Sequence, residues 1–280
     1  MKHADLAFER LAGEPAIWVT VDATQGSVPR DAGTWMAVFA NSLVGTIGGG
    51  HVEHQVMVLA RRRLAGDSGP EVLRFALGPS LGQCCGGVMM LRLEWVDQTS
   101  IVTLRARLDS SRTPLALFGG GHVGHALVDV LARLPFAVTW IDSRESMLPT
   151  LTVRNVVCEH SDPVQAAVAE LAPGSAVLIM SFSHAEDLDI VAACLHRLRR
   201  TNDLPYIGLI GSKTKWATFR HRLSERGFRD DELARVTSPI GLPGVPGKEP
   251  EVIAIAVAAQ LLQWRPRIEP APRADGPISK

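Results

Sequence analysis

The chain has 280 residues, of which 46% are hydrophobic and 21% charged, and 29 basic and 29 acidic residues give a formal net charge of zero. This is the composition of a globular protein long enough for two domains. The charge balance argues against nucleic acid or a membrane surface as a partner. The N-terminal segment lacks the apolar core of a signal peptide, and an apolar run such as Val252–Leu262 is too short to span a bilayer. We therefore expect a cytoplasmic protein.

The four cysteines do not have the pattern of a secreted disulfide framework. Cys84 and Cys85 are adjacent, and a disulfide between neighbours would close a strained ring. Cys158 and Cys194 lie in an apolar strand and on an apolar helix face, where we expect packed thiols.

Residues 1–98 are expected to form a small α+β domain. Apolar runs bounded by turn residues indicate strands, and apolar residues at helical spacing indicate helices. We expect helices at His3–Ala12 and Glu53–Leu64, a loop at Thr24–Gly33, and strands at Ala16–Thr20, Trp35–Phe39, Leu43–Ile47, Val72–Leu77 and Val88–Trp95.

Two glycine-rich segments mark this domain. In the first, three glycines precede a helix and free its first backbone N–H groups for an anion or a polar ligand, with His51 and Glu53 at the mouth of the turn. The alternative is an ordinary helix entry, in which Glu53 favours the helix dipole and His51 is solvated.

The second segment, Gly78–Gly87, contains Cys84 and Cys85 between glycines. A glycine-rich loop exposes its backbone, so we expect an accessible thiol. The candidate roles are a metal ligand, persulfide or thiolate chemistry, and contact with a soft-metal cofactor. The missing C-x-x-C pattern argues against zinc. Two buried small residues in a tight turn are the structural alternative.

The segment 99–113 is more polar and is expected to be a linker. A second domain, residues 114–264, follows with alternating strands and helices, which predicts a Rossmann-like parallel sheet. Residues 265–280 hold four prolines and few large apolar groups and are expected to be a disordered tail. The expected strands are Leu115–Phe118, Ala137–Ile141, Val153–Cys158, Ala176–Phe182 and Ile207–Ile210, and the expected helices are His125–Leu134, Asp162–Leu171, Asp187–Arg200, Lys215–Gly227 and Glu251–Trp264.

The first strand of this second domain is followed by a dinucleotide-type turn with Gly119, Gly121 and Gly124, and Asp142 ends the next strand. Strand, glycine turn and helix form the context in which this motif places a phosphate on a helix N-terminus and the acid on a ribose hydroxyl. We therefore predict a nucleotide-type ligand, with NAD(P) as one option. The alternative is that the glycines only make a tight turn and Asp142 only ends the strand.

Further candidates follow later strands, at the edge where ligands bind in open α/β sheets. His184 follows the fourth strand, and Ser212 and Lys213 follow the fifth. Lys248 lies in a glycine–proline loop. The two lysines together are suited to a phosphate, although each alone is an ordinary surface lysine.

The chain resembles the XdhC/CoxI family of xanthine dehydrogenase accessory proteins. The resemblance covers nearly the whole chain except the tail, and the paired-cysteine and GGGHVE segments are its most specific parts. It rests on GTIGGGHVE (Gly45–Glu53), LGPSLGQCCGG (Leu77–Gly87), LALFGGGHVGHAL (Leu115–Leu127), YIGLIGSKTKW (Tyr206–Trp216) and PIGLPGVPGKEPEVIA (Pro239–Ala254).

This resemblance implies a small N-terminal domain, a Rossmann-like domain and a role connected with purine catabolism. Such proteins bind the molybdenum cofactor (molybdopterin), support its sulfuration by a cysteine desulfurase and deliver it to the molybdenum subunit of apo-xanthine dehydrogenase. They are chaperones and insertases rather than enzymes. Carried over to this sequence, Gln83, Cys84 and Cys85 form the cofactor-contacting loop, with His51 and Glu53 beside it, and either cysteine of the pair contacts the molybdenum.

Two other functions compete with this interpretation. An NAD(P)-dependent oxidoreductase would use the Gly119–Gly124 turn and Asp142. A thiol redox or metal-storage protein would use Cys84 and Cys85. A homodimer is expected only from the frequency of dimers among proteins.

Overall fold

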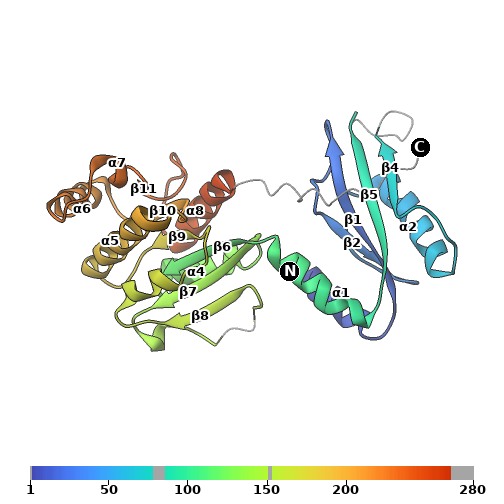
Figure 1. Ribbon diagram of the computed structural model, residues 1–280, viewed down its shortest axis with the longest axis horizontal. Helices are drawn as coiled ribbons and strands as arrows, with labels where there is room; N and C mark the ends of the chain where they lie inside the picture. Colours follow the sequence, from blue (N-terminus) through green and yellow to red (C-terminus); the bar gives the residue numbers. More distant parts are fainter. Residues whose placement is uncertain (1, 78–85, 151–152, 266–280) are drawn as a thin grey trace. The chain divides into compact units, whose positions relative to one another are not determined.

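The computed structural model describes residues 2–77, 86–150 and 153–265 (Figure 1). The chain forms two compact units that divide between Arg107 and Leu108. This boundary lies within the segment predicted to be a linker. Among the described residues, no helix is long and apolar enough to cross a membrane. The predicted tail lies outside the described residues, apart from Arg265.

The N-terminal unit is built on an antiparallel sheet with the order β3-β2-β1-β5-β4. The expected strands are confirmed, but β1 continues to Gln25, and α2 begins at Gly50, three residues before the predicted start. His51 and Glu53 therefore lie in the first turn of this helix. The elements are α1 (Lys2–Leu11), β1 (Ala16–Gln25), β2 (Trp35–Val38), β3 (Leu43–Gly45), α2 (Gly50–Leu64), β4 (Val72–Ala76) and β5 (Val88–Val96).

Strand alternation separates the two faces of this sheet. Ile17, Val19 and Val21 of β1 belong to the core cluster that also contains Val52 and Val56 of α2. Figure 1 shows α2 beside this sheet. Trp18 lies between these residues in β1, so its side chain points to the opposite face of the sheet. It stacks on the Phe8 ring, at 6.2 Å between centroids, and on the Trp35 ring, at 4.3 Å.

The predicted linker is largely helical. It forms η2 (Gln98–Ser100) and α3 (Ile101–Ser110). The Asp97 side chain accepts a hydrogen bond from the Thr99 backbone N–H at 2.9 Å, and the Ser100 hydroxyl accepts one from the Asp97 N–H at 3.2 Å. This reciprocal capping stabilises the start of η2, and it explains why a segment with a polar composition is helical.

The C-terminal unit contains a six-stranded parallel sheet with the order β11-β10-β9-β6-β7-β8 (Figure 1). Successive strands run outward from β6 to β8 and then from β9 to β11, so the order reverses between β6 and β9. This is the doubly wound Rossmann arrangement, as predicted. Its strands are β6 (Thr113–Phe118), β7 (Phe136–Asp142), β8 (Val156–His160), β9 (Ala176–Ile179), β10 (Tyr206–Leu209) and β11 (Val236–Thr237).

Helices cover both faces of this sheet. Leu115 and Leu117 of β6 pack in a cluster with residues of α4 and α8, whereas Ala116 and Phe118 belong to a cluster with residues of η4, α5 and α6. Burial on both faces explains why the strands are continuously apolar. The helical elements are α4 (His122–Leu131), η3 (Glu145–Met147), η4 (Val164–Glu170), α5 (His184–Thr201), α6 (Lys213–Glu225), α7 (Asp230–Leu233) and α8 (Pro250–Trp264).

Four elements of this unit differ from the prediction. The segment expected as a helix at Asp162–Leu171 is the 3₁₀ helix η4, and the short elements η3, α7 and β11 were not predicted. Elements this short carry too few residues for a periodic pattern. The remaining helices and strands differ from the prediction mainly at their ends.

Candidate functional site

The carboxyl ends of β6, β7, β9 and β10 bring most of the predicted C-terminal residues to one edge of the sheet. The glycine turn follows β6, Asp142 is the last residue of β7, His184 begins α5 after β9, and Ser212 and Lys213 follow β10. Lys248 is exposed in the loop between β11 and α8. The topology therefore collects residues distant in sequence at the edge where open α/β sheets bind ligands.

Two glycines of the turn are required by packing. Gly119 has a φ of +122°, and a Cβ there would overlap the backbone carbonyl oxygen of Met180. A Cβ on Gly124 would overlap the carbonyl oxygen of Gly119. The turn therefore places β6 and the segment after β9 in backbone contact, which only glycine allows.

Gly121 differs from these two. A Cβ there would have no atom within 4 Å. Gly121 is also the N-cap of α4 and makes no side-chain capping hydrogen bond. The space beside the Cα of Gly121 is therefore open at the start of α4, and helix starts of this kind suit an anionic group.

Asp142 is engaged within the chain. Its side chain is 1% exposed and accepts hydrogen bonds from the Gly120 N–H at 2.5 Å and from the Arg144 guanidinium at 2.9 and 3.0 Å. Burial by itself raises the pKa of Asp142, but the hydrogen bonds from Arg144 and Gly120 outweigh it and the net pKa is lowered. In this structure the carboxylate stabilises the glycine turn, which favours its structural interpretation over a ribose contact.

A buried ion pair at the same edge was missed by the sequence analysis. Lys215 Nζ lies 2.5 Å from Asp187 Oδ2 and donates to the Ile210 carbonyl at 2.9 Å. The Ser181 hydroxyl and N–H both donate to Asp187 Oδ1, at 2.7 and 2.8 Å. These contacts tie the segment after β9 to the segment after β10. The pattern drew attention to Lys213 instead, because it directly follows a glycine and a serine at the end of a strand.

The predicted residues around this pair have separate environments. The Ser212 hydroxyl caps α6 by accepting the Lys215 N–H at 3.1 Å. His184 is exposed, and its ring lies edge-on to the buried Phe219 ring at 6.1 Å between centroids. Lys213 is exposed. Ser212 therefore has a structural role, while His184 and Lys213 remain at the edge as predicted.

In the N-terminal unit, Glu53 holds the first glycine turn. Its Oε2 accepts hydrogen bonds from the Thr46 hydroxyl at 2.5 Å, the Ile47 N–H at 3.0 Å and the Gly49 N–H at 3.1 Å. Glu53 is therefore a positioning residue for the turn. His51 is exposed, and its Nε2 lies 3.0 Å from Gln55 Nε2.

The structure also brings this turn near the ends of the paired-cysteine segment. Gly48 packs against Pro29, where a Cβ on Gly48 would lie 2.8 Å from the Pro29 ring. Gly87 packs against the same loop, and a Cβ there would lie 2.4 Å from the Ser27 carbonyl oxygen. The Leu77 N–H donates to the Gly87 carbonyl at 2.8 Å and closes the β4–β5 connection. Gln83, Cys84 and Cys85 lie outside the described residues.

Two family models match the chain. The model of the XdhC Rossmann domain matches residues 115–261, and the model of the XdhC and CoxI family matches residues 10–76. The first match alone covers more than half of the chain. The chain belongs to the XdhC and CoxI family. The resemblance noted from the sequence motifs is thereby confirmed.

Two individual proteins are similar to this chain. The uncharacterized protein YqeB of Escherichia coli (strain K12) is 28% identical over 247 residues, which are 86% of this chain and 42% of that protein. This chain therefore spans less than half the length of that curated relative. A solved structure described as a xanthine dehydrogenase from Bacillus halodurans matches with a TM-score of 0.74 at 21% identity, covering 97% of this chain and 98% of that chain. It shares the fold.

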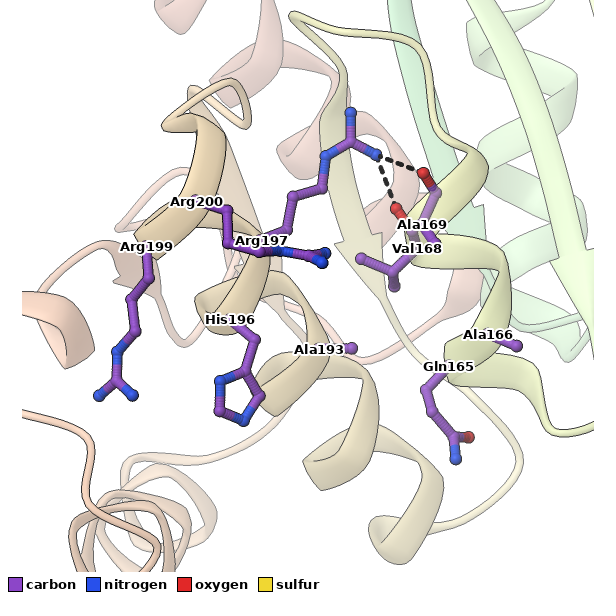
Figure 2. Close-up of a pocket in the computed structure, with 9 residues that line it drawn as sticks. All are labelled: Gln165, Ala166, Val168, Ala169, Ala193, His196, Arg197, Arg199 and Arg200. Carbon is purple, nitrogen blue, oxygen red and sulfur yellow. Dashed lines mark hydrogen bonds between the residues drawn. The ribbon is translucent and has the colours of Figure 1, made fainter.

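A separate hollow of about 480 Å³ lies between η4 and α5 in this XdhC-family Rossmann unit (Figure 2). Its lining includes His196, Arg197 and Arg200. Arg197 is used internally, because it donates to the carbonyls of Val168 and Leu171 at 2.7 Å. His196 lies twelve residues beyond the start of α5, or roughly 18 Å along the helix. This hollow is distinct from the predicted edge.

Proposed function

We propose that this chain is a xanthine dehydrogenase accessory protein that binds the molybdenum cofactor in its N-terminal unit. It supports sulfuration of the cofactor by a cysteine desulfurase and delivers it to the molybdenum subunit of apo-xanthine dehydrogenase. The carrying observation is that the glycine turn before α2 and Gly87, at the end of the paired-cysteine segment, pack against the same loop. Family membership supports the accessory role.

The residue types of the N-terminal unit suit this cofactor. Molybdopterin has a phosphate, a polar pterin and a sulfur-ligated metal. A Cβ on Gly49 would meet no atom within 4 Å, and α2 starts there without a side-chain cap, so N–H groups of its first turn can approach a phosphate. The carboxylate of Glu53 accepts the Gly49 N–H and fixes the conformation of the turn. Cys84 and Cys85 supply soft thiolates suited to the molybdenum–sulfur group.

Cofactor binding is tested by anaerobic mixing with molybdenum cofactor, followed by gel filtration and assay of the protein fraction for molybdenum and pterin. We expect both to co-elute with the wild-type protein and to be lost in Cys84→Ala or Cys85→Ala. Cys158→Ala is the matched control, because that thiol lies in the C-terminal unit. Failure of the wild type to retain molybdenum, or full retention by both loop variants, would contradict the proposal.

Delivery is tested separately by adding the loaded protein to apo-xanthine dehydrogenase and measuring urate formation. We expect activity to require this protein in its loaded form, and activation to increase when a cysteine desulfurase and cysteine are present. A strain that lacks the protein and still has wild-type dehydrogenase activity would contradict an accessory role. Loss of xanthine dehydrogenase activity in the same strain would identify the dehydrogenase as the partner in the cell.

A further inference from the structure

Helix α8 of the C-terminal unit is apolar around its whole circumference. Of its 15 residues, only Glu251 is charged. One side of the helix, which includes Val257 and Leu261, is buried in the core cluster that also contains residues of α4. On another side, Ile255 is 61% exposed and Leu262 is 44% exposed. A helix that is apolar all round is normally covered on every side, so the exposed side of α8 indicates a partner.

The exposed side has the spacing of a coiled-coil seam. Val252, Ile255, Ala259 and Leu262 follow one another at intervals of three, four and three residues, and we call these four residues the α8 seam. This is the a and d spacing of a heptad, in which apolar residues of two helices interlock. The seam extends roughly 15 Å along the helix. Its spacing therefore suits a second helix with the same pattern.

Two charged residues at opposite ends of the seam indicate which helix this is. Glu251 is exposed in the first turn of α8, and Arg265 directly follows the helix. They are fourteen residues apart, which is two heptads, so they flank the seam on the same side. The Arg265 guanidinium donates to two neutral groups, the Thr113 hydroxyl at 2.9 Å and the Ser111 carbonyl at 3.1 Å. Within residues 2–77, 86–150 and 153–265, neither charge has an ion-pair partner.

We infer that α8 is a dimerisation helix, whose seam packs antiparallel against the same seam of a second copy of this chain. In this arrangement Ile255 of each copy lies opposite the small Ala259 of the other, and Glu251 of each copy approaches Arg265 of the other. The ion pair therefore forms twice about a two-fold axis, as in an isologous interface. A parallel arrangement would instead place Glu251 beside Glu251, where like charges repel. The inference concerns the C-terminal unit and is independent of cofactor binding at the paired cysteines.

The length of the seam sets the expected strength of the dimer. Helix α8 is about 22 Å long, and one pair of helices of this length forms a small interface. Interfaces that bury less than about 1,200 Å² are typical of weak complexes. We therefore expect a reversible dimer whose fraction increases with protein concentration.

Sedimentation velocity of the full chain over a wide range of concentration tests this inference. We expect the wild type to form dimers, and Ile255→Lys to raise the dissociation constant about tenfold or more, because a central apolar contact is lost twice. Val157→Lys is the matched control, since Val157 is 62% exposed in the same unit but lies on β8, and it should leave the dissociation constant unchanged. Circular dichroism checks that both variants keep the fold.

A second variant tests the direction of packing. Glu251→Gln should raise the dissociation constant severalfold in the antiparallel dimer, because two ion pairs are lost, and high salt should reduce this difference. In a parallel dimer the same variant would lower the dissociation constant, because it removes a repulsion. A wild type that is still monomeric at about 200 μM, a dimer unaffected by Ile255→Lys, or a tighter dimer of Glu251→Gln would overturn the inference. The first of these results is also the one expected if another part of the same chain covers α8.

Discussion

The buried pair of Lys215 and Asp187 gives the sharpest stability prediction. Their side chains are 11% and 3% exposed. Lys215→Met removes the cation and leaves the Asp187 carboxylate with only the N–H and hydroxyl of Ser181. Removing one partner of a buried pair costs about 3–5 kcal/mol, because the remaining charge stays desolvated. We expect the free energy of unfolding to fall by about 3 kcal/mol, at the lower end of this range, because two hydrogen bonds to the carboxylate remain.

A double-mutant cycle isolates the pair itself. Asp187→Asn leaves the ammonium of Lys215 buried beside the Ile210 carbonyl and should also cost about 3 kcal/mol. The double variant contains neither charge, so its cost should be smaller than the sum of the single costs by at least 1–2 kcal/mol, as expected for directly coupled residues.

Amide hydrogen exchange of β9 and β10 is the suitable assay, because it reports unfolding of the C-terminal unit separately from the other unit. Lys213→Met is the matched control. That lysine is two residues earlier and exposed, so its replacement should change stability by less than about 0.5 kcal/mol. Equal effects of Lys215→Met and Lys213→Met, or additive effects in the cycle, would refute the assigned role of the pair.

Three further results are expected. Gly119→Ala should sharply lower the melting temperature, because its Cβ would overlap a backbone carbonyl at a φ of +122°, whereas Gly121→Ala should have little effect on melting. A hydrogen bond from Arg197 lowers the pKa of Asp203 to about 2, below its unfolded value of about 3.9. This contribution to the free energy of unfolding is present above pH ~4 and is lost as the pH falls toward 2. Between these pH values, the free energy of unfolding should therefore fall less in Asp203→Asn than in the wild type. Burial raises the pKa of Cys194 to about 12, so this thiol should resist alkylation at pH 8 until the protein is unfolded, as mass spectrometry can show.

Much of the fold followed from local patterns. The apolar strands of the C-terminal unit, the glycine turn and the helix after it were predictable because each is specified by neighbouring residues. The 3₁₀ helix η4 and the capped start of η2, which leads into α3, were not predictable. The first is too short for a periodic pattern, and the second depends on side-chain capping by Asp97 and Ser100.

The candidate site divides in the same way. The sequence indicated that Gly119 and Gly124 make a close turn, and it placed Asp142 and Ser212 at the correct sheet edge. It did not show that Asp142 and Glu53 use their carboxylates to hold glycine turns. Whether a carboxylate is free for a ligand depends on which backbone N–H groups face it, and that is decided only when the turns are packed.

The sequence by itself determined the succession of elements, the two glycine turns and the family motifs, because these depend on residues close together along the chain. Only the tertiary structure decided which side chains meet across the sheet edge. Arg144 reaches Phe182, and Lys215 rather than Lys213 reaches Asp187. The physical reason is that the segments after β7, β9 and β10 are brought together at one sheet edge by strand order and helix orientation, which are consequences of long-range packing of apolar faces.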